Sequence, residues 1–207
     1  MAVDAALKLR IYNDALRHLG SRSLASVSEA RESRRVLDSA WRPVAWLEAA
    51  EWNFALRSTV AEASPSIEPD FGFRLVYDHP DDYVRLAALS PDEFFRTVLI
   101  AQQYTDEAGY WFTDFEPLYV RYVSSDDDYG LNGGIWPESF IRFVGAQLAF
   151  DCCERITGDK GKLSDMAAVL KRARTDAKAK DAASEGVKFP PLGSWNRARR
   201  SFGYNRG

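Results

Sequence analysis

The spacing of apolar residues changes twice along this chain of 207 residues, and this change limits the possible folds more than any other feature. From about residue 4 to residue 62, and again from 137 to 183, apolar side chains recur every three or four residues, as in an amphipathic helix. From Phe71 to Tyr77 they alternate with other residues, which is typical of a β-strand. The chain is therefore expected to carry a β-rich segment between helical segments.

The helical segments divide into four predicted helices, which cover residues 4–19, 29–62, 137–157 and 162–183. Pro43 lies inside the second of these, so a kink or break is expected near 39–43, because proline has no backbone N–H to donate. Between the two helix pairs, short strands are predicted at 83–89, 94–103, 109–113 and 117–123.

The simplest assembly of these elements is a mainly α fold of the α+β class. It consists of a four-helix bundle with a β-rich insertion and an extended C-terminal tail. The bundle is expected to be one discontinuous domain made of residues 1–63 and 136–183, with the insertion at 64–135 and the tail at 184–207. One domain with an elaboration suits this length better than two full domains.

Charge is divided unevenly between the body of the chain and its tail. Residues 1–183 carry 22 basic and 29 acidic residues, net −7, whereas residues 184–207 carry five basic and one acidic, net +4. Within the insertion, the segment 68–128 holds 14 acidic residues and four arginines. The overall net charge of −3 argues against a general nucleic-acid coat, which needs a basic surface.

No group of residues has the spacing of a catalytic or metal centre. His18 and His79 fall in different predicted elements, and the run 126–128 (Asp-Asp-Asp) lacks the glycine and the terminal glutamate of an EF-hand loop. No Gly-rich loop runs into a Lys-Ser/Thr pair, as phosphate binding would require. The sequence therefore predicts no catalytic residue, no metal and no cofactor, although the 30 acidic residues leave carboxylate-based catalysis open.

Cysteine usage and hydropathy indicate the compartment. Cys152 and Cys153 are adjacent, which is poor geometry for one zinc ion and excludes a secreted framework of disulfides between distant segments. The first residues lack the apolar run of a signal peptide, and no stretch approaches the roughly 18 apolar residues of a membrane span. We therefore expect folding in a reducing cytosol and no membrane partner.

The C-terminal tail interleaves aromatic and basic side chains. These are Trp195, Arg197, Arg199, Arg200, Phe202 and Tyr204. Trp, Tyr and Arg dominate the hot spots of protein interfaces, and the same composition suits phosphate contacts and base stacking on nucleic acid. A tail without fixed structure is the third interpretation, which three large aromatics in thirteen residues disfavour.

Four groups of short segments, in this order along the chain, carry a family resemblance. They are Tyr12–Leu16 with Leu19-Gly20 and Leu24–Ser26; Ala40-Trp41 leading to Glu51–Arg57; Gly72-Phe73 through Pro80–Asp82 to Val84–Leu86; and Leu118–Val123, then Trp136–Phe140 with Ala146–Ala149. Over residues 8–185 the chain resembles the head-to-tail adaptor proteins of short-tailed bacteriophages, also called head-to-tail connectors or tail tubular A proteins. The tail matches that family in character only.

The resemblance implies a structural, non-enzymatic virion protein, assembled in the host cytoplasm. Such adaptors form a ring, usually of twelve copies, beneath the portal at the head–tail junction. The ring extends the DNA channel for packaging retention and ejection, DNA passes without sequence-specific binding, and nozzle or tail-fibre proteins attach below. In that family the C-terminal segment docks on the portal. The predicted portal-binding residues are therefore Trp195, Arg197, Arg199, Arg200, Phe202 and Tyr204, with Trp195 and Phe202 as anchors.

The acidic insertion allows two interpretations within this scheme. A channel wall that bound phosphates tightly would impede ejection, so an acidic wall would let DNA slide, or the insertion would contact neighbouring subunits or the nozzle. Two other functions also stay open. One is a junction protein with peptidoglycan-hydrolase activity based on paired carboxylates, and the other is a nucleic-acid-binding module that acts through the basic tail.

Overall fold

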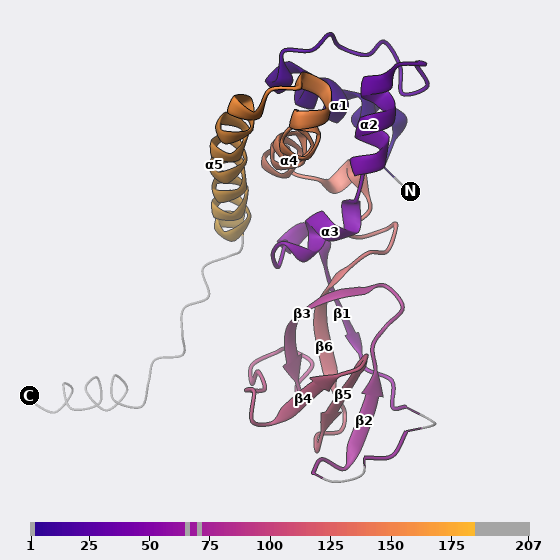
Figure 1. Ribbon diagram of the computed structural model, residues 1–207. Helices are drawn as coiled ribbons and strands as arrows, with labels where there is room; N and C mark the ends of the chain where they lie inside the picture. Colours follow the sequence, from indigo (N-terminus) through magenta and orange to yellow (C-terminus); the bar gives the residue numbers. More distant parts are fainter. Residues whose placement is uncertain (1–2, 65–66, 70–71, 185–207) are drawn as a thin grey trace, which may run out of the picture.

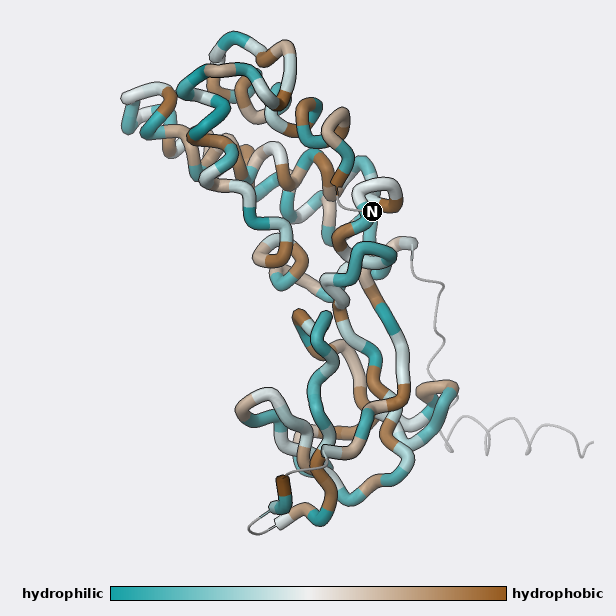
Figure 2. Tube along the Cα trace, turned by 90° about the vertical axis from the view of Figure 1, so that its right-hand side faces the viewer, coloured by the Kyte–Doolittle hydropathy of each residue, from teal (hydrophilic) through white to brown (hydrophobic). Residues whose placement is uncertain are grey.

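The chain folds into a helical part and a β part that lie end to end. The computed structural model describes residues 3–64, 67–69 and 72–184. Figure 1 shows the helical part above the β part, and the view turned by 90° in Figure 2 shows the same arrangement. Within the described ranges there are five α-helices: α1 (Ala5–Leu19), α2 (Glu32–Ala40), α3 (Pro43–Glu48), α4 (Glu138–Thr157) and α5 (Lys160–Ser184).

Helix α4 is the centre of the helical part. It is apolar on nearly every side, with Phe140, Val144 and Leu148 almost fully buried, and α1, α2 and α5 all pack against it. Its first turns join an aromatic cluster in which the Phe140 ring lies 5.0 Å from both Trp52 and Trp136. The helical core is therefore built around α4.

The expected four-helix bundle is wrong, because the predicted helix over 29–62 forms only in part, although the break expected near 39–43 is present. Helix α2 stops at Ala40, and Pro43 starts the short helix α3 instead of continuing α2. After a 3-10 turn at Asn53–Ala55, residues Leu56–Val60 form strand β1. This strand pairs with a segment more than sixty residues later, and that pairing overrides the local helical spacing.

The β part consists of two antiparallel sheets of three strands each, within the residues that the structure describes. The strands are β1, β2 (Leu75–Asp78), β3 (Tyr83–Ser90), β4 (Tyr104–Glu107), β5 (Tyr110–Thr113) and β6 (Tyr119–Ser124), in the orders β1-β6-β3 and β2-β5-β4. Trp111, Leu118 and Tyr122 belong to the small apolar core of this part. With five helices and two sheets the fold is α+β.

Three of the four short strands predicted in the insertion correspond to β3, β5 and β6, but the one predicted at 94–103 is wrong. A turn held by Asp92 occupies its start: the backbone N–H groups of Phe94 and Arg96 donate to the Asp92 carboxylate at 3.3 and 3.0 Å. Phe95 then adopts a positive φ of 53°, which an extended strand does not allow. The segment is therefore a loop, although its apolar residues suggested a strand.

A partly buried carboxylate ties together the strands of the β1-β6-β3 sheet where this sheet meets the helical part, a place we call the joint. Asp82, in the turn before β3, accepts hydrogen bonds from the Tyr122 hydroxyl at 2.8 Å, from Arg57 at 3.0 Å and from the Ser124 hydroxyl. Burial alone would raise the pKa of Asp82, but these three donors outweigh it and hold the pKa below its ordinary value. Asp82 therefore stays ionised and holds β1, β3 and β6 in register at the joint.

Gly130 completes this joint by its lack of a side chain. A Cβ atom at this position would lie 2.1 Å from the Ser124 carbonyl oxygen and 2.7 Å from Leu47 Cδ1. The loop between β6 and α4 can therefore pass between strand and helix only with glycine there.

Candidate docking grooves

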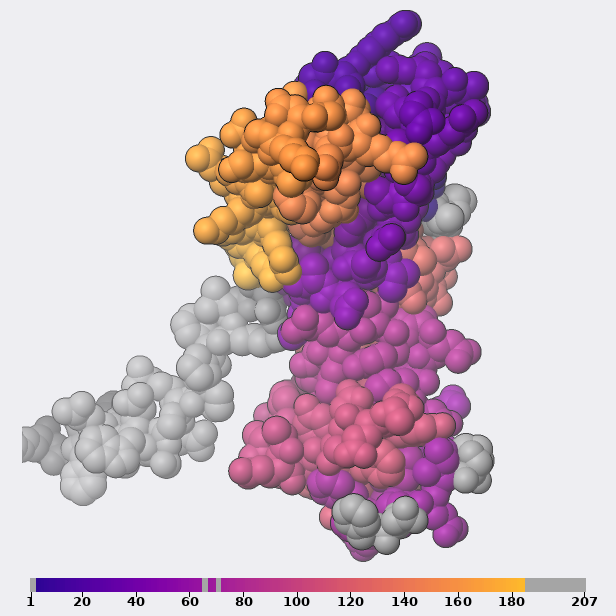
Figure 3. Space-filling model, viewed as in Figure 1, coloured from indigo at the N-terminus to yellow at the C-terminus, as the bar shows by residue number. Residues whose placement is uncertain are grey.

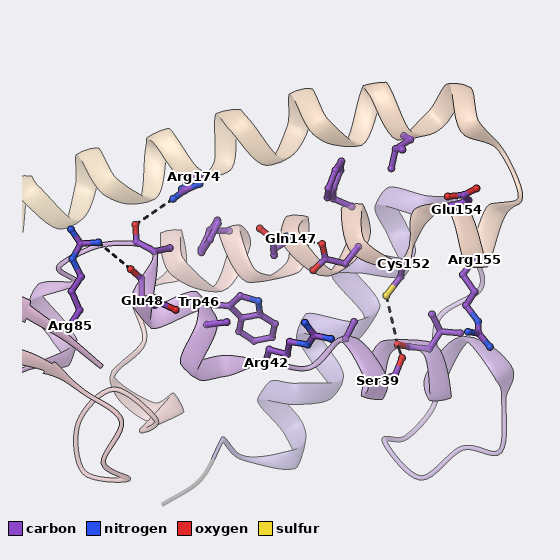
Figure 4. A pocket seen from close by; sticks show the side chains of 18 residues that line it. Ser39, Arg42, Trp46, Glu48, Arg85, Gln147, Cys152, Glu154, Arg155 and Arg174 are labelled. Atoms are coloured by element: carbon purple, nitrogen blue, oxygen red, sulfur yellow. Dashed lines mark hydrogen bonds between the residues drawn. The ribbon is translucent and has the colours of Figure 1, made fainter. Parts of the chain in front are cut away.

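The helical part has a wide groove between α5 and the α2–α3 segment, which we call the helical groove. It encloses about 950 Å³. Helix α5 packs mainly on α4, and among its described residues only Met166 and Ala177 are buried. Figure 3 shows α5 as one outer side of the helical part, and Figure 4 shows the groove beneath it. A 25-residue helix with so little buried surface leaves most of its faces available for another chain.

The floor of the helical groove is apolar and its rim is charged. Trp46, Phe143, Phe150 and Leu163 contribute the apolar lining. The charged lining consists of Arg42, Arg85, Arg155, Arg174, Glu48, Asp151 and Glu154. An apolar floor with a mixed-charge rim is the composition of a protein interface.

Two of the four rim arginines donate hydrogen bonds to backbone carbonyls. Arg174 donates to the Ala49 carbonyl at 3.4 Å and Arg85 to the Glu48 carbonyl at 3.3 Å (Figure 4). These two contacts tie α5 and β3 to the end of α3. The groove therefore has a fixed width at its lower end.

Asp151 and Cys152 of α4 line the groove, and neither is prepared for nucleophilic chemistry. Partial burial on the groove wall raises the pKa of Asp151, against a hydrogen bond from Gln147 at 2.9 Å that lowers it. Burial, with the nearby Asp151 charge, raises the pKa of the Cys152 thiol to about 11. The Cys152 thiol stays protonated near neutral pH and donates to the Val36 carbonyl at 3.8 Å.

The structure keeps the two histidines apart. His18 lies in the last turn of α1, whereas His79 follows β2 and stacks on Tyr83 and Trp111, each with ring centroids 4.2 Å away. Its Nε2 lies 3.3 Å from Asp106 Oδ1, and burial lowers the pKa of His79 against the raising effect of that carboxylate. This arrangement joins the two sheets through ring packing.

The described residues contain neither a metal-binding cluster nor a membrane-spanning helix. Across 3–64, 67–69 and 72–184 there is no group of three or more His, Cys, Asp or Glu that could hold a metal ion. Over the same ranges, no helix combines the length and the apolar character needed to cross a membrane.

The six predicted portal-binding residues lie outside the described residues. They are Trp195, Arg197, Arg199, Arg200, Phe202 and Tyr204, and the described chain ends at Ser184, the last residue of α5. Sequence reasoning missed the helical groove, although one signal was present. Beyond Leu170 the sequence of α5 turns to Ala, Lys, Arg and Asp, which indicates a helix with little buried surface.

The segments that carry the family resemblance serve mainly to hold the fold. The Asn13 side chain holds the segment that follows α1 in place. It donates a hydrogen bond to the Leu24 carbonyl at 3.0 Å and accepts one from the Leu24 N–H at 2.7 Å. Trp136 donates to the Gly130 carbonyl at 2.8 Å, and Asp82 holds the joint. The resemblance therefore concerns residues that set architecture.

Comparison of the chain with models of known protein families gives no match, and comparison with curated proteins gives none either.

Proposed function

We propose that this protein is a non-enzymatic subunit of the adaptor ring at the head–tail junction of a short-tailed bacteriophage. In this role the protein would assemble with copies of itself into a ring of twelve subunits. The ring would bind the portal and the nozzle or tail-fibre proteins. The ring would extend the DNA channel through which the genome is retained and ejected. The observation that carries the proposal is the helical groove beneath the sparsely buried helix α5.

The groove supports assembly because it leaves apolar surface exposed in the single chain. A partner chain would bury that surface. Burying apolar surface stabilises a protein by about 25 cal/mol per Å², yet α5 leaves most of its residues exposed, and Leu163 and Phe150 lie beside an open groove. A neighbouring copy that inserted an element there would bury this surface. The alternating charges on the rim would fix its register.

The β part supports the proposal through its charge. In the insertion acidic residues far outnumber the arginines, and phosphate contacts dominate the affinity of proteins for DNA. A β part that faced passing DNA would therefore hold it weakly, as a channel requires. The tail residues, of which Trp195 and Phe202 are the proposed anchors, would dock on the portal.

The test places a large side chain in the helical groove. It compares this variant with the same substitution at a neighbouring residue of α3 that lies outside the groove. Ala45 lines the helical groove, whereas Val44 is 44% exposed and lies outside the lining. Mass photometry of the full chain mixed with the portal protein of the same phage should show rings for the wild type and for Val44→Arg. For Ala45→Arg the ring fraction should fall about tenfold or more, because a loss of about 1.4 kcal/mol per contact already gives that factor.

Thermal unfolding of both variants serves as the control, and the two should melt like the wild type because both positions are exposed. If rings form equally well with Ala45→Arg, the helical groove is not part of the interface between subunits. A wild-type chain that stays monomeric with the portal at micromolar concentration would contradict the proposed function itself.

A further inference from the structure

A second groove lies between the β part and the C-terminal end of α5, and we call it the exit groove. It encloses about 770 Å³. One wall is the loop after β3, with Phe94, Phe95 and Val98, and the opposite wall includes Lys178, Asp181 and Ala182 of α5. The exit groove is separate from the helical groove, because no residue lines both.

The loop presents apolar side chains to solvent in a fixed geometry. Phe94 is 63% exposed and Val98 is 50% exposed, which is unusual for residues of this size. Their positions are set by the Asp92 turn and by Phe95, whose ring lies 4.3 Å beneath the Arg121 guanidinium. Phe94 and Val98 thus form a preformed apolar wall, of the kind that binds a peptide segment.

The described chain ends beside this groove. The Asn53 backbone N–H donates to the Asp181 carboxylate at 3.0 Å, and the Asn53 side chain donates to the Asp181 carbonyl at 2.8 Å. These bonds pin the last turns of α5 against the start of the β part. Because Ala182 lines the groove and Ser184 ends the helix, the chain continues from the edge of the exit groove.

We propose that residues 187–192 of the same chain, Val-Lys-Phe-Pro-Pro-Leu, occupy the exit groove. Val187 lies five positions after Ala182, and an extended chain of that length spans up to about 17 Å, so the segment reaches the groove without strain. Two consecutive prolines favour the polyproline conformation, which binds aromatic-lined grooves at a low entropic cost. Phe189 and Leu192 supply the apolar side chains that match Phe94 and Val98.

This contact would divide the tail into two functional pieces. Residues 187–192 would fasten the tail to its own body, and the arginine-rich stretch that starts at Trp195 would be left for a partner. The inference uses only the groove and the chain exit. It holds whether or not the protein forms a ring.

Limited trypsin digestion of the full chain tests this contact with an internal reference. Trypsin cleaves after Lys188, inside the proposed docked segment, and after Arg197, outside it. If 187–192 is docked, cleavage after Lys188 should be about tenfold slower than cleavage after Arg197, because proteolysis tracks the population of the open form. Intact-mass spectrometry over a time course gives both rates.

Three variants locate the contact. Phe94→Ser with Val98→Ser should bring the rate after Lys188 close to the rate after Arg197, and Leu192→Ser should do the same from the tail side without touching the folded body. Ile100→Ser is the matched control, because Ile100 is 58% exposed on the same loop but does not line the groove, and it should keep the wild-type ratio.

Equal rates of cleavage after Lys188 and Arg197 in the wild type would overturn the proposal. Protection that disappears on dilution, together with a dimer in size-exclusion chromatography, would also overturn it, since the groove would then hold the segment of a second copy. Neither result depends on ring formation with the portal. Failure here is therefore distinct from failure of the proposed function.

Discussion

The two parts of the molecule are stabilised in different ways. The core of the helical part is almost purely apolar and aromatic, with Phe140 and Trp52 near its centre. The β part has a smaller core, and titratable groups, His79 and Asp82 among them, pack at its edges. Titratable groups occur beside both cores, since Asp38 in the helical part accepts hydrogen bonds from Tyr12 and Arg34, but the larger apolar core lies in the helical part and an imidazole lies within the ring packing of the β part. Three substitutions test this contrast.

The largest effect is expected from Phe140→Ala in the helical core. The Phe140 ring contacts Trp52, Trp136 and Phe54, with centroids 4.8 to 5.0 Å away, and it is 1% exposed. Removing it leaves a cavity, so the free energy of unfolding should fall by about 3–5 kcal/mol. Urea unfolding followed by tryptophan fluorescence measures the loss, and the loss should be the same at pH 5.5 and pH 7.5.

The control for this substitution is the exposed residue Val44 on α3. Val44→Ala should change the free energy of unfolding by less than about 0.5 kcal/mol. A loss below about 1 kcal/mol for Phe140→Ala would mean that the aromatic cluster is not the centre of this core.

A smaller loss is expected from Asp82→Asn at the joint. The amide keeps the shape of the carboxylate but leaves Arg57 without its partner there, although Asp126 still lies 3.6 Å from Arg57. We expect a loss of about 2 kcal/mol, because breaking a mostly buried charged pair leaves one charge uncompensated. Urea unfolding at pH 7 measures this loss.

The loss of stability in Asp82→Asn should depend on pH, because only the ionised carboxylate stabilises the fold. The depressed pKa of Asp82 stabilises the folded chain above the unfolded pKa of about 3.9, and this contribution disappears as the pH falls through the lower folded value. The stability difference between wild type and Asp82→Asn should therefore shrink as the pH falls from about 3.9 towards the lower folded value. A constant difference between pH 7 and pH 3 would contradict the role of the Asp82 charge.

The smallest effect is expected from His79, and it appears only on acidification. Burial lowers the pKa of His79, so the unfolded chain binds a proton more readily than the folded chain between about pH 6.5 and the lower folded value. In that window stability should fall as the pH falls, by at most about 1.4 kcal/mol per pH unit. Thermal melts from pH 7.5 to pH 5 measure this slope.

The matched pair for this test is His79→Phe and His18→Phe. His79→Phe keeps the ring packing against Trp111 and should flatten the slope, whereas His18→Phe should leave it unchanged because His18 lies on α1, outside the β part. A slope that survives in His79→Phe would assign the pH dependence to another group.

The sequence predicted the elements whose apolar spacing and end signals are local, strands β3, β5 and β6 among them. The helices expected at 4–19, 137–157 and 162–183 correspond closely to α1, α4 and α5, because apolar spacing and the terminal glycines Gly20 and Gly158 act within one helix. The predicted helix over 29–62 was wrong because β1 depends on pairing with β6, which helical spacing does not report. The strand predicted at 94–103 was wrong because the Asp92 turn precedes it.

The candidate sites were harder to predict than the helices. Both grooves arise from the distance between α5 and elements far away in sequence, namely α3 and the loop after β3. No local pattern encodes such a distance. The exposed character of α5 was visible in its composition, but the residues that it would face were not.

The fastening of α5 at both ends has a mechanical consequence. Near its start, Lys162 Nζ donates to the Leu19 carbonyl at 2.6 Å, and near its end Asp181 is bonded to Asn53, three residues before β1. A pull on the chain beyond Ser184 is therefore delivered first to Asn53 and then along β1. Force applied at the C-terminus would reach β1, which pairs with β6, and also the aromatic core, because Trp52 directly precedes Asn53 and packs on Phe140.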